Sequence, residues 1–567
     1  MAQTVQTYSI PARERLRLWL LSGHKVTELT AHPEPQAIGS YARGRQLMGG
    51  NYQFAGDLIV APGQGIWHIT PPTDAFAQDL HRFGWLDDLA AVGTQEARGV
   101  AQLWALDWVD RYGLGRGPGW GAADTGRRMI HSLSHAPLLL AGLDAAKQKH
   151  LFRSLGRQAA WLRRDWPKAP PGLPRVEALV GEIYAGISLA GQSGLRRRAI
   201  EALAESLTDD VDNEGGIPSR SPEDLLEVYT LLGWVLEAFR ESGQSLPDPI
   251  WAAMERITPT LRALRHVDGG LARFHGGGRG RTGQLDKALV TSGLRTPAAT
   301  GQAMGFATLS HGRISLIADA SAPPRGRASV QGHASTLAFE MTSGGYPVIV
   351  NCGSGRNFGP DWAQACRASA SHSTLSLDKF SSSRLSDPIQ GAGVRYRPLV
   401  QTPKRVIQQK TAERTGTTLI LSHDGYAAQH GLTHLRRLSL NSTGTTLSGE
   451  DSLRALSRRD KARFDDQFDA SGMTGLPYAV RFHLHPDTEA FVDMGGRAIS
   501  VTLQNREVWV FRCNVGQKME LAPSVYMDPT RFKPRATKQI VLSARAMGYA
   551  QTIEWQLTKA QSAPTGL

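Results

Sequence analysis

Apolar residues in the first half of the chain recur at the three- and four-residue spacings of amphipathic helices. The pattern predicts helices over residues 74–92 and 96–113. Five further segments show the same spacing, at residues 124–142, 146–166, 175–191, 196–211 and 221–243. Asp124-Thr125 and Ser221-Pro222 are typical of helix starts. Consecutive helices separated by short Gly-, Pro- or Asp-rich loops predict stacked hairpins, in a solenoid or a closed toroid, without a strict repeat motif.

The pattern changes in the second half. Residues 267–284, VDGGLARFHGGGRGRTGQ, contain seven glycines and predict a connector or functional loop, because glycine disfavours a helix interior. After about residue 300, short runs rich in Val, Ile, Thr and aromatic residues alternate with polar positions. No helical pattern interrupts them, so the predicted sheets are antiparallel and stacked. The sequence therefore predicts a helical domain over 1–290, a β-sandwich over 291–567, and a substrate cleft between them.

Composition adds a preference for polyanionic partners. The 567-residue chain has a formal charge of +13, which favours nucleic acid, anionic lipid or acidic polysaccharide as a partner, although for charge alone a solvated basic surface is the better explanation. The three cysteines, at 352, 366 and 513, argue against a disulfide framework and a thiolate zinc site. The apolar run Leu18–Leu21 is too short for a signal peptide, and no stretch has the length of a membrane span. We expect a cytoplasmic protein.

Two histidines stand in stretches with the pattern of strands, GHASTLAFEMTSGGYPVIVNCGSG and CRASASHSTLSLD. A tight turn at Ser343-Gly344-Gly345 joins two strands, so His333 and Asn351 should lie near each other at one edge of the sandwich. His372 begins a further strand after the intervening loop. Two imidazoles and an amide oxygen that meet beside the cleft form either a metal site or a hydrogen-bonded polar cluster. The residues themselves leave both interpretations open.

These stretches resemble the heparinase II/III family of polysaccharide lyases. The family pattern has His-Ala-Asp, a Gly-Gly turn, a strand that ends Asp-x-Gly, and then Arg before a His-Asn-Thr run. The segments DGGLARFHGGG and HDGY…HLRRLSL…GEDSL…RFHLHP are also similar. The resemblance covers nearly the whole chain and implies an (α/α) toroid followed by an antiparallel β-sandwich. It also implies β-elimination of a uronic-acid polysaccharide, and makes a periplasmic or cell-envelope location an alternative to the cytoplasm.

The resemblance also implies roles for individual residues. His333 matches the sheet histidine that neutralises the uronate or transfers a proton, and we add His372, Tyr184 and Arg175 as catalytic candidates. Arg220, His275 and Arg367 are the candidates for substrate binding. The family carboxylate that binds a structural metal is replaced here by Asn351. A divalent zinc or calcium ion held by His333, Asn351 and His372 is therefore weighed evenly against a cluster without metal.

The helical half departs from the family pattern in two regions, residues 173–175 and 217–224. Leu173-Pro174-Arg175 stands where the family has Asn followed by His or Arg. Ile217 replaces a histidine, and Glu223-Asp224 occupies the place of a Tyr-His pair, whereas Arg220-Ser221-Pro222 is retained. Two functions follow: a lyase of an acidic polysaccharide, or a catalytically degenerate protein for glycan binding or envelope assembly. Nucleic-acid binding ranks last, because no recognised module is present.

Overall fold

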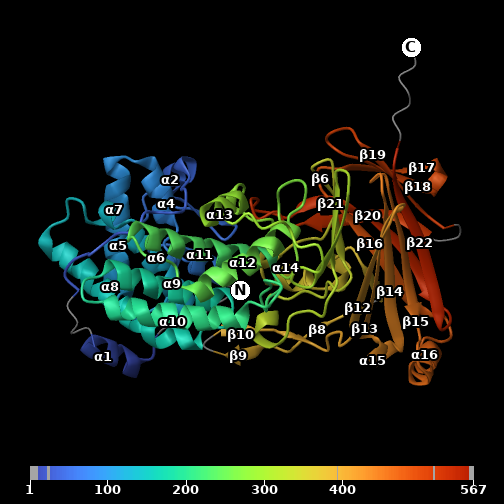
Figure 1. Cartoon of the computed structure of the whole chain (residues 1–567), viewed down its shortest axis with the longest axis horizontal. Helices are drawn as coiled ribbons and strands as arrows, with labels where there is room; N and C mark the ends of the chain where they lie inside the picture. The colour runs from blue at the N-terminus through green and yellow to red at the C-terminus, as the bar shows by residue number, and fades with distance from the viewer. Residues whose placement is uncertain (1–9, 22–25, 378, 392–393, 515–517, 561–567) are drawn as a thin grey trace, which may run out of the picture.

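The computed structural model describes residues 10–21, 26–377, 379–391, 394–514 and 518–560. The chain folds into a helical part and a β part that lie side by side along the long axis of the molecule (Figure 1). The last long helix of the first part ends at Ser292, and the first strand of the second part begins at Phe306. No helix among these residues is long and apolar enough to cross a lipid bilayer.

The helical part contains consecutive helices that pack as hairpins, such as α9 with α10, and α6 packs against α9 with the N-terminal ends of both helices close together. The helices are α1 (Ala12–Leu21), α2 (Tyr41–Met48), α3 (Asp74–His81), α4 (Trp85–Val92), α5 (Gln95–Tyr112), α6 (Ala122–Ser134), α7 (Ala136–Leu140), α8 (Ala145–Asp165), α9 (Leu173–Ser188), α10 (Ser193–Asp210), α11 (Pro222–Glu241), α12 (Asp248–Ala263) and α13 (Gln284–Ser292). A short hairpin, β1 (Asn51–Phe54) and β2 (Asp57–Val60), joins the N-terminal helices.

Local sequence explains several helix boundaries. Ser221 is the N-cap of α11, where its hydroxyl accepts from Asp224 N at 3.2 Å, as predicted. Helix α6 begins at Ala122, not at Asp124. The segment 74–92 divides into α3 and α4, because Phe83 takes a positive φ of 65°. The periodicity did not predict α12, whose interior holds Pro259.

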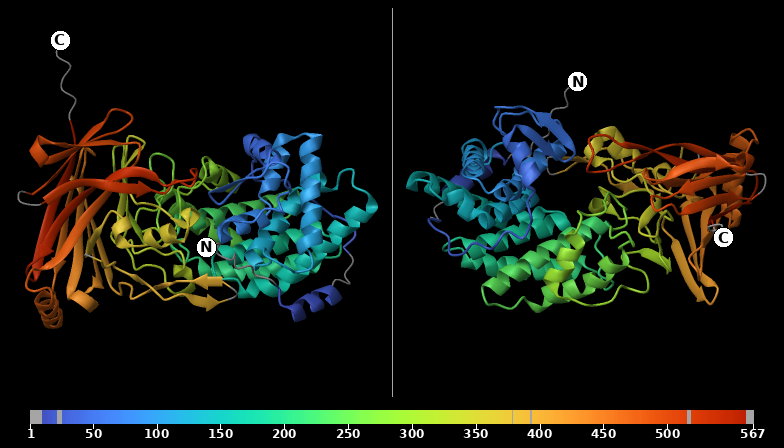
Figure 2. Two further views of the ribbon diagram at one scale, coloured as in Figure 1. Left: turned by 180° about the vertical axis from the view of Figure 1, so that it is seen from behind. Right: turned by 90° about the horizontal axis from the view of Figure 1, so that it is seen from above.

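The β part contains two eight-stranded antiparallel sheets (Figure 2). One has the order β12-β13-β14-β15-β22-β19-β18-β17, and the other β20-β21-β16-β6-β5-β4-β3 with β7 beside β16. Their strands are β3 (Phe306–His311), β4 (Ile314–Asp319), β5 (Phe339–Ser343), β6 (Tyr346–Val350), β7 (Leu375–Leu377), β12 (Val406–Glu413), β13 (Gly416–Tyr426), β14 (Leu432–Asn441), β15 (Thr446–Arg454), β16 (Leu476–Leu484), β17 (Glu489–Asp493), β18 (Ala498–Thr502), β19 (Val508–Cys513), β20 (Lys518–Tyr526), β21 (Arg535–Ala546) and β22 (Ala550–Lys559).

Small elements supplement the sheets. Short strands β8 (Arg384–Leu385) and β11 (Leu399–Val400) form one pair, and β9 (Ile389–Gly391) and β10 (Val394–Tyr396) form another. Contrary to the expectation of strands alone, helices α14 (Pro360–Ala365), α15 (Ala427–His430) and α16 (Arg458–Ala470) lie between strands. Helix α16 has a capping box between Ser457 and Asp460, which marks a helix start independently of hydrophobic periodicity.

The two parts share a core. The apolar cluster of the helical part continues into Phe306, Ile317 and Ala338 of the β part. The rings of Phe274 and Phe306 lie 4.9 Å apart across this junction. The segment between α12 and α13 therefore packs against the first strands, which fixes where the two parts meet.

Candidate functional site

A cleft of about 910 Å³ opens between the helical part and the β part. The helical part contributes the tip of the β1–β2 hairpin, helix α3 and the glycine-rich segment 276–282. The β part contributes residues 353–357, the end of β16 and the segment 526–530. The predicted position of a cleft at the junction of the two parts agrees with the structure.

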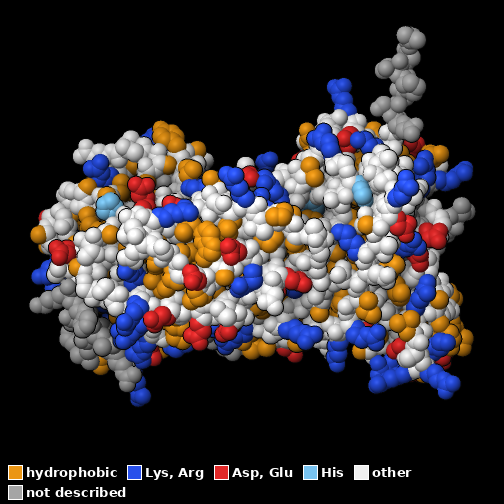
Figure 3. All heavy atoms as spheres, viewed as in Figure 1, with side chains coloured by type: hydrophobic (Ala, Val, Ile, Leu, Met, Phe, Trp, Pro, Cys, Tyr) orange, Lys and Arg blue, Asp and Glu red, His pale blue; other side chains and the backbone are white. Residues whose placement is uncertain are grey.

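The walls of this cleft carry more cations than anions. Seven arginines line it, namely Arg43, Arg82, Arg273, Arg279, Arg281, Arg356 and Arg535. Four carboxylates line it, namely Asp79, Glu223, Asp487 and Asp528. Figure 3 shows that Lys and Arg side chains occur over both parts of the visible face, so bulk charge by itself does not mark a site. The concentration of guanidinium groups around a concave surface does mark one.

The arginines of the cleft differ in how fully they are paired. Arg82 contacts Asp124 at 2.8 Å and Glu177 at 3.2 Å. Arg356 donates to Gln78 Oε1 at 3.1 Å, which is a neutral partner. Arg356 is exposed and has no salt bridge among the described residues, so its guanidinium keeps donors for an anion.

The glycine-rich segment is held by a carboxylate of α11. Glu223 accepts from Gly278 N at 2.7 Å, and burial raises the pKa of its carboxyl. Burial also raises the pKa of neighbouring Asp224 to about 6. A Cβ at Gly277 would lie 2.7 Å from Ser221 Oγ, so a side chain there would collide with the start of α11. The residues that replace the family Tyr-His pair therefore organise this loop.

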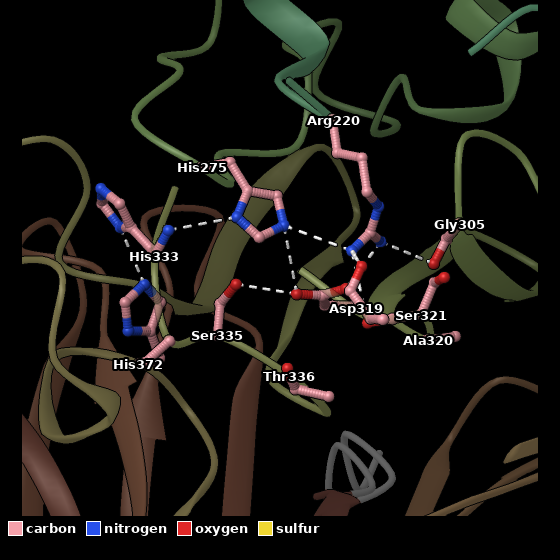
Figure 4. A network of polar contacts seen from close by, with 12 residues as sticks. Arg220, His275, Gly305, Asp319, Ala320, Ser321, His333, Ser335, Thr336 and His372 are labelled. Atoms are coloured by element: carbon pink, nitrogen blue, oxygen red, sulfur yellow. Dashed lines mark hydrogen bonds and ion pairs between the residues drawn. The ribbon is translucent and has the colours of Figure 1, made fainter. Parts of the chain in front are cut away.

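His333 and His372 come together, as predicted, but beneath the cleft and not on its wall. They lie in irregular segments before β5 and β7, not within strands. His333 Nδ1 is 3.0 Å from His372 Nε2, and His372 Nδ1 donates to Ala368 O at 2.8 Å (Figure 4). Since His372 Nδ1 carries a proton, its Nε2 accepts from His333 Nδ1. Burial lowers the pKa of His372 to about 4 and lowers the pKa of His333 well below its usual value, so both rings are neutral at pH 7.

Arg220 and His275 belong to a buried network that links the two parts (Figure 4). Arg220 contacts Asp319 Oδ1 at 2.7 Å and donates to the carbonyl oxygens of Met304, Gly305, Ser321 and Ala322. His275 Nδ1 accepts from His333 N, and His275 Nε2 lies 3.4 Å from Asp319 Oδ2. These contacts, chiefly the Arg220 charge, hold the pKa of Asp319 well below its usual range. The loop that contains His275 does face the cleft, through Gly276 to Thr282, but His275 itself is not among the lining residues, so its predicted role in substrate binding has no support from the cleft geometry.

The remaining candidates also lie away from the cleft walls. Arg367 donates to the carbonyl oxygens of Ser329, Gly332 and Arg397, and burial lowers its pKa to about 10. Tyr184 is buried in the helical core, with its hydroxyl 3.5 Å from Trp234 O, and burial raises its pKa. Arg175, at the start of α9, donates to Ala169 O at 3.2 Å. Tyr184 and Arg175 are not brought to His333, whereas Arg367 binds the carbonyl oxygen of the preceding Gly332 and its charge helps to lower the pKa of His333.

The third predicted metal ligand lies near the histidine pair but is already engaged. Asn351 Oδ1 accepts from Ser373 N at 3.0 Å, and its Nδ2 donates to Glu340 Oε1 at 3.4 Å. Among the residues that the structure describes, no three His, Cys, Asp or Glu side chains are grouped so as to hold an ion. This donor set does not fit a three-ligand centre. Zinc or calcium binding stays a prediction, and elemental analysis of the purified protein tests it.

Sequence reasoning missed the residues that form the cleft surface. Arg82, Arg281 and Arg356 come from three distant segments, and nothing in their local sequence distinguishes them from surface arginines. Tyr526 and His485 also line the cleft, with ring centroids 4.9 Å apart. The guanidinium of Arg273 lies 4.1 Å from the Tyr526 ring centroid. Of the segments that line the cleft, the glycine-rich segment was the one that the sequence predicted as a functional loop.

Comparison with known proteins agrees with this architecture. Residues 293–556 match the family model described as heparinase II/III-like, C-terminal. FtsZ-localized protein C of Caulobacter vibrioides is 32% identical over 545 residues, which cover 94% of this chain and 90% of the relative. Crystal structures of heparinase III (TM-score 0.71, 12% identity, 98% of this chain and 92% of that one) and of a heparan sulfate lyase from Pedobacter heparinus (TM-score 0.56, 14% identity, 98% and 88%) share the fold. The chain belongs to the heparinase II/III-like family, with a helical toroid followed by a β-sandwich.

Proposed function

We propose that this chain is a binding member of the family, which holds an acidic polysaccharide in the arginine-lined cleft without cleaving it. The observation that carries the proposal is that the histidines at the family's catalytic positions lie apart from the arginines that line the cleft. The histidines that resemble the catalytic and metal residues of the lyases are buried and hydrogen-bonded to protein, whereas the cleft surface presents arginines.

The chemistry of β-elimination explains why this separation matters. A base must reach the proton beside the uronate carboxylate, and a second group must neutralise that carboxylate as charge develops. His333 and His372 are 4% and 1% exposed, and Tyr184 is 1% exposed. A sugar in the cleft does not contact side chains placed in this way. Glu223 and Asp224 at the Tyr-His position add carboxylates, which would repel a uronate.

The cleft suits recognition of carboxylate or sulfate groups. Guanidinium groups bind such anions through two parallel hydrogen bonds. Arg281 and Arg356 are exposed on the walls, and neither has a salt bridge to a carboxylate within the described part of the chain. These two side chains therefore have donors for a ligand, while Arg82 and Arg273 are committed to neighbouring carboxylates.

An assay for both binding and cleavage tests this function. Purified protein is incubated with hyaluronan, heparin or chondroitin sulfate, and the ultraviolet absorbance of unsaturated product is followed beside a direct binding measurement. We expect binding that weakens as salt increases, without unsaturated product. If the unmodified protein formed unsaturated product, and His333→Ala or Tyr526→Phe abolished that product, the protein would instead be a lyase. Absence of binding to every polymer would refute the proposed function.

A second candidate function rests on the relative that matches along the whole chain. FtsZ-localized protein C covers 94% of this sequence at 32% identity, and we propose that the present protein also associates with FtsZ assemblies. Co-sedimentation with FtsZ polymers, compared with the protein alone, tests it. A protein that stays in the supernatant at all FtsZ concentrations would contradict it. The cytoplasmic location stays a prediction, which fractionation of cells that express the protein addresses.

A further inference from the structure

We infer that the cleft is closed at one end by a bridge between the two parts of the molecule, so that it receives the terminus of an acidic polysaccharide and not an internal segment. This inference rests on the proposed function and specifies which part of the polymer is recognised. The bridge consists of the tip of the β1–β2 hairpin and residue Gln78 on one side, and residues Arg356 and Asn357 on the other.

The helical side of the bridge is a rigid tip. Ala55 and Gly56 both have positive φ, 47° and 88°, which is typical of the tight two-residue turn of a hairpin. Asp79 of α3 accepts from Ala55 N at 3.1 Å and fixes the tip to the adjacent helix. The adjoining α3 also carries Gln78, so the two contact points of the helical side are held by the same elements.

The β side reaches this tip through the segment that follows β6. A Cβ built at Gly56 would lie 2.9 Å from Asn357 Cβ, so the two backbones approach as closely as glycine permits. Arg356, the preceding residue, donates to Gln78 Oε1 at 3.1 Å. In the view from above, the blue N-terminal region and the yellow segment lie next to each other (Figure 2, right). Two neighbouring residues thus contact the opposite part at separate points.

The bridge forms a wall of the cleft. Gly56 and Gln78 line the cleft from one part, and Arg356 and Asn357 line it from the other. A polysaccharide that ran through this position would have to separate them. The volume of about 910 Å³ falls within the roughly 300–1,000 Å³ range of small-ligand pockets, as expected for a few sugar units.

The charges at the bridge indicate which group would sit there. Arg356 lies near Arg82 but also near the carboxylates of Asp224, Glu177 and Asp124, and none of these carboxylates forms a salt bridge with it among the described residues. A terminal uronate carboxylate placed against the exposed Arg356 side chain would give it a direct anionic partner. Sugar units further along the chain would extend past the glycine-rich segment toward Arg281, at the exposed side of the cleft.

Binding stoichiometry distinguishes terminal from internal recognition. Hyaluronan fractions of defined length are titrated with the protein at about 0.15 M salt, and the number of proteins bound per polymer chain is measured by light scattering. Terminal recognition predicts one protein per chain at every length. A number that grows in proportion to length overturns the inference but leaves the proposed function standing. Absence of binding at every length refutes both.

Variants of the bridge test the cause. The double variant Gln78→Ala, Asn357→Gly removes the acceptor of Arg356 and the Cβ that lies against Gly56 while it keeps every cleft arginine, and we expect the number bound per chain to rise with length. Arg437→Ala, on the exposed face of β14, is the matched control and should behave as the unmodified protein. One protein per chain at every length in the double variant would show that the bridge does not exclude internal segments and would overturn the inference.

Discussion

At the scale of single residues, the buried polar groups serve to join the parts of the molecule. The guanidinium of Arg220, a residue at the start of α11 with φ of 51°, makes all its contacts with the segment 304–322 and with His275. A buried cation of this kind is tolerated because each of its donors is paired. Arg220, which the sequence predicts to bind substrate, therefore has a structural role that explains its presence.

The first prediction concerns this pair. Asp319→Ala leaves the Arg220 charge buried without its carboxylate, and we expect a loss of about 3–5 kcal/mol in the free energy of unfolding. Urea denaturation followed by circular dichroism measures it. The exposed control Arg437→Ala should change the free energy by less than about 0.5 kcal/mol. A loss of under 1 kcal/mol for Asp319→Ala would contradict the structural role.

The second prediction is a pH dependence of stability that arises at His81. Its Nδ1 accepts from Trp108 Nε1 at 2.9 Å, and burial, aided by Arg128, lowers its pKa from 6.5 to about 3. The unfolded chain therefore binds the proton first, so this stabilisation is complete above pH 6.5 and is lost as the pH falls toward 3. The expected slope from this group is about 1.4 kcal/mol per pH unit.

A conservative variant isolates that contribution. His81→Asn retains an acceptor for Trp108 but no titrating ring, so its free energy of unfolding should decline less steeply between pH 6.5 and 4. His150→Asn, at an exposed position that contacts Asp110, serves as the control. Equal slopes for His81→Asn and the unmodified protein would exclude His81 as the source.

At the scale of elements, tight packing between neighbouring strands depends on particular small residues. Gly449 of β15 lies opposite Trp555 of β22, and a Cβ at Gly449 would overlap the indole ring. The same ring stacks on Phe339 and Phe511, and its Nε1 donates to Asp451 at 3.0 Å. Because Gly449 has no side chain, the Trp555 ring can lie against it and stack on its two phenylalanine partners in the centre of the sandwich.

The third prediction follows from this contact. Gly449→Ala should destabilise the protein by about 1–3 kcal/mol, because the ring must shift away from its stacking partners. Differential scanning calorimetry measures the change as a lower melting temperature. Gly548→Ala is the matched control, since no atom lies within 4 Å of a Cβ there. Equal melting temperatures for the two variants would refute the packing argument.

At the scale of the whole molecule, the proposed function depends on a surface that neither part contains alone. Arg281 belongs to the segment before α13, and Arg356 to the loop after β6, yet both line one cleft. Under this proposal, the formal charge of +13 attracts polyanions at long range and the cleft determines where they bind. The division at residues 290 and 291 stays a prediction, which limited proteolysis of the connection between α13 and β3 tests.

The fourth prediction separates bulk charge from the cleft. Arg281→Ala and Arg356→Ala should each weaken hyaluronan binding about tenfold or more and reduce its salt dependence, because each removes a charge-assisted contact. Isothermal titration calorimetry at several salt concentrations gives both quantities. Arg437→Ala removes the same charge from a remote surface. An equal loss of affinity in all three variants would mean that binding follows net charge alone.

The sequence by itself determined the order of the two parts, most of the long helices and the Gly-Gly hairpin between β5 and β6. These features depend on local periodicity and turn chemistry, which a sequence states directly, whereas the expected proximity of His333 to His372 also drew on the family resemblance. The tertiary structure alone decided that the two histidines lie beneath the cleft, that Arg220 and His275 bind Asp319, and that Arg82, Arg281 and Arg356 share one surface. Burial and partners depend on segments far apart in the chain, and no local pattern records how those segments meet.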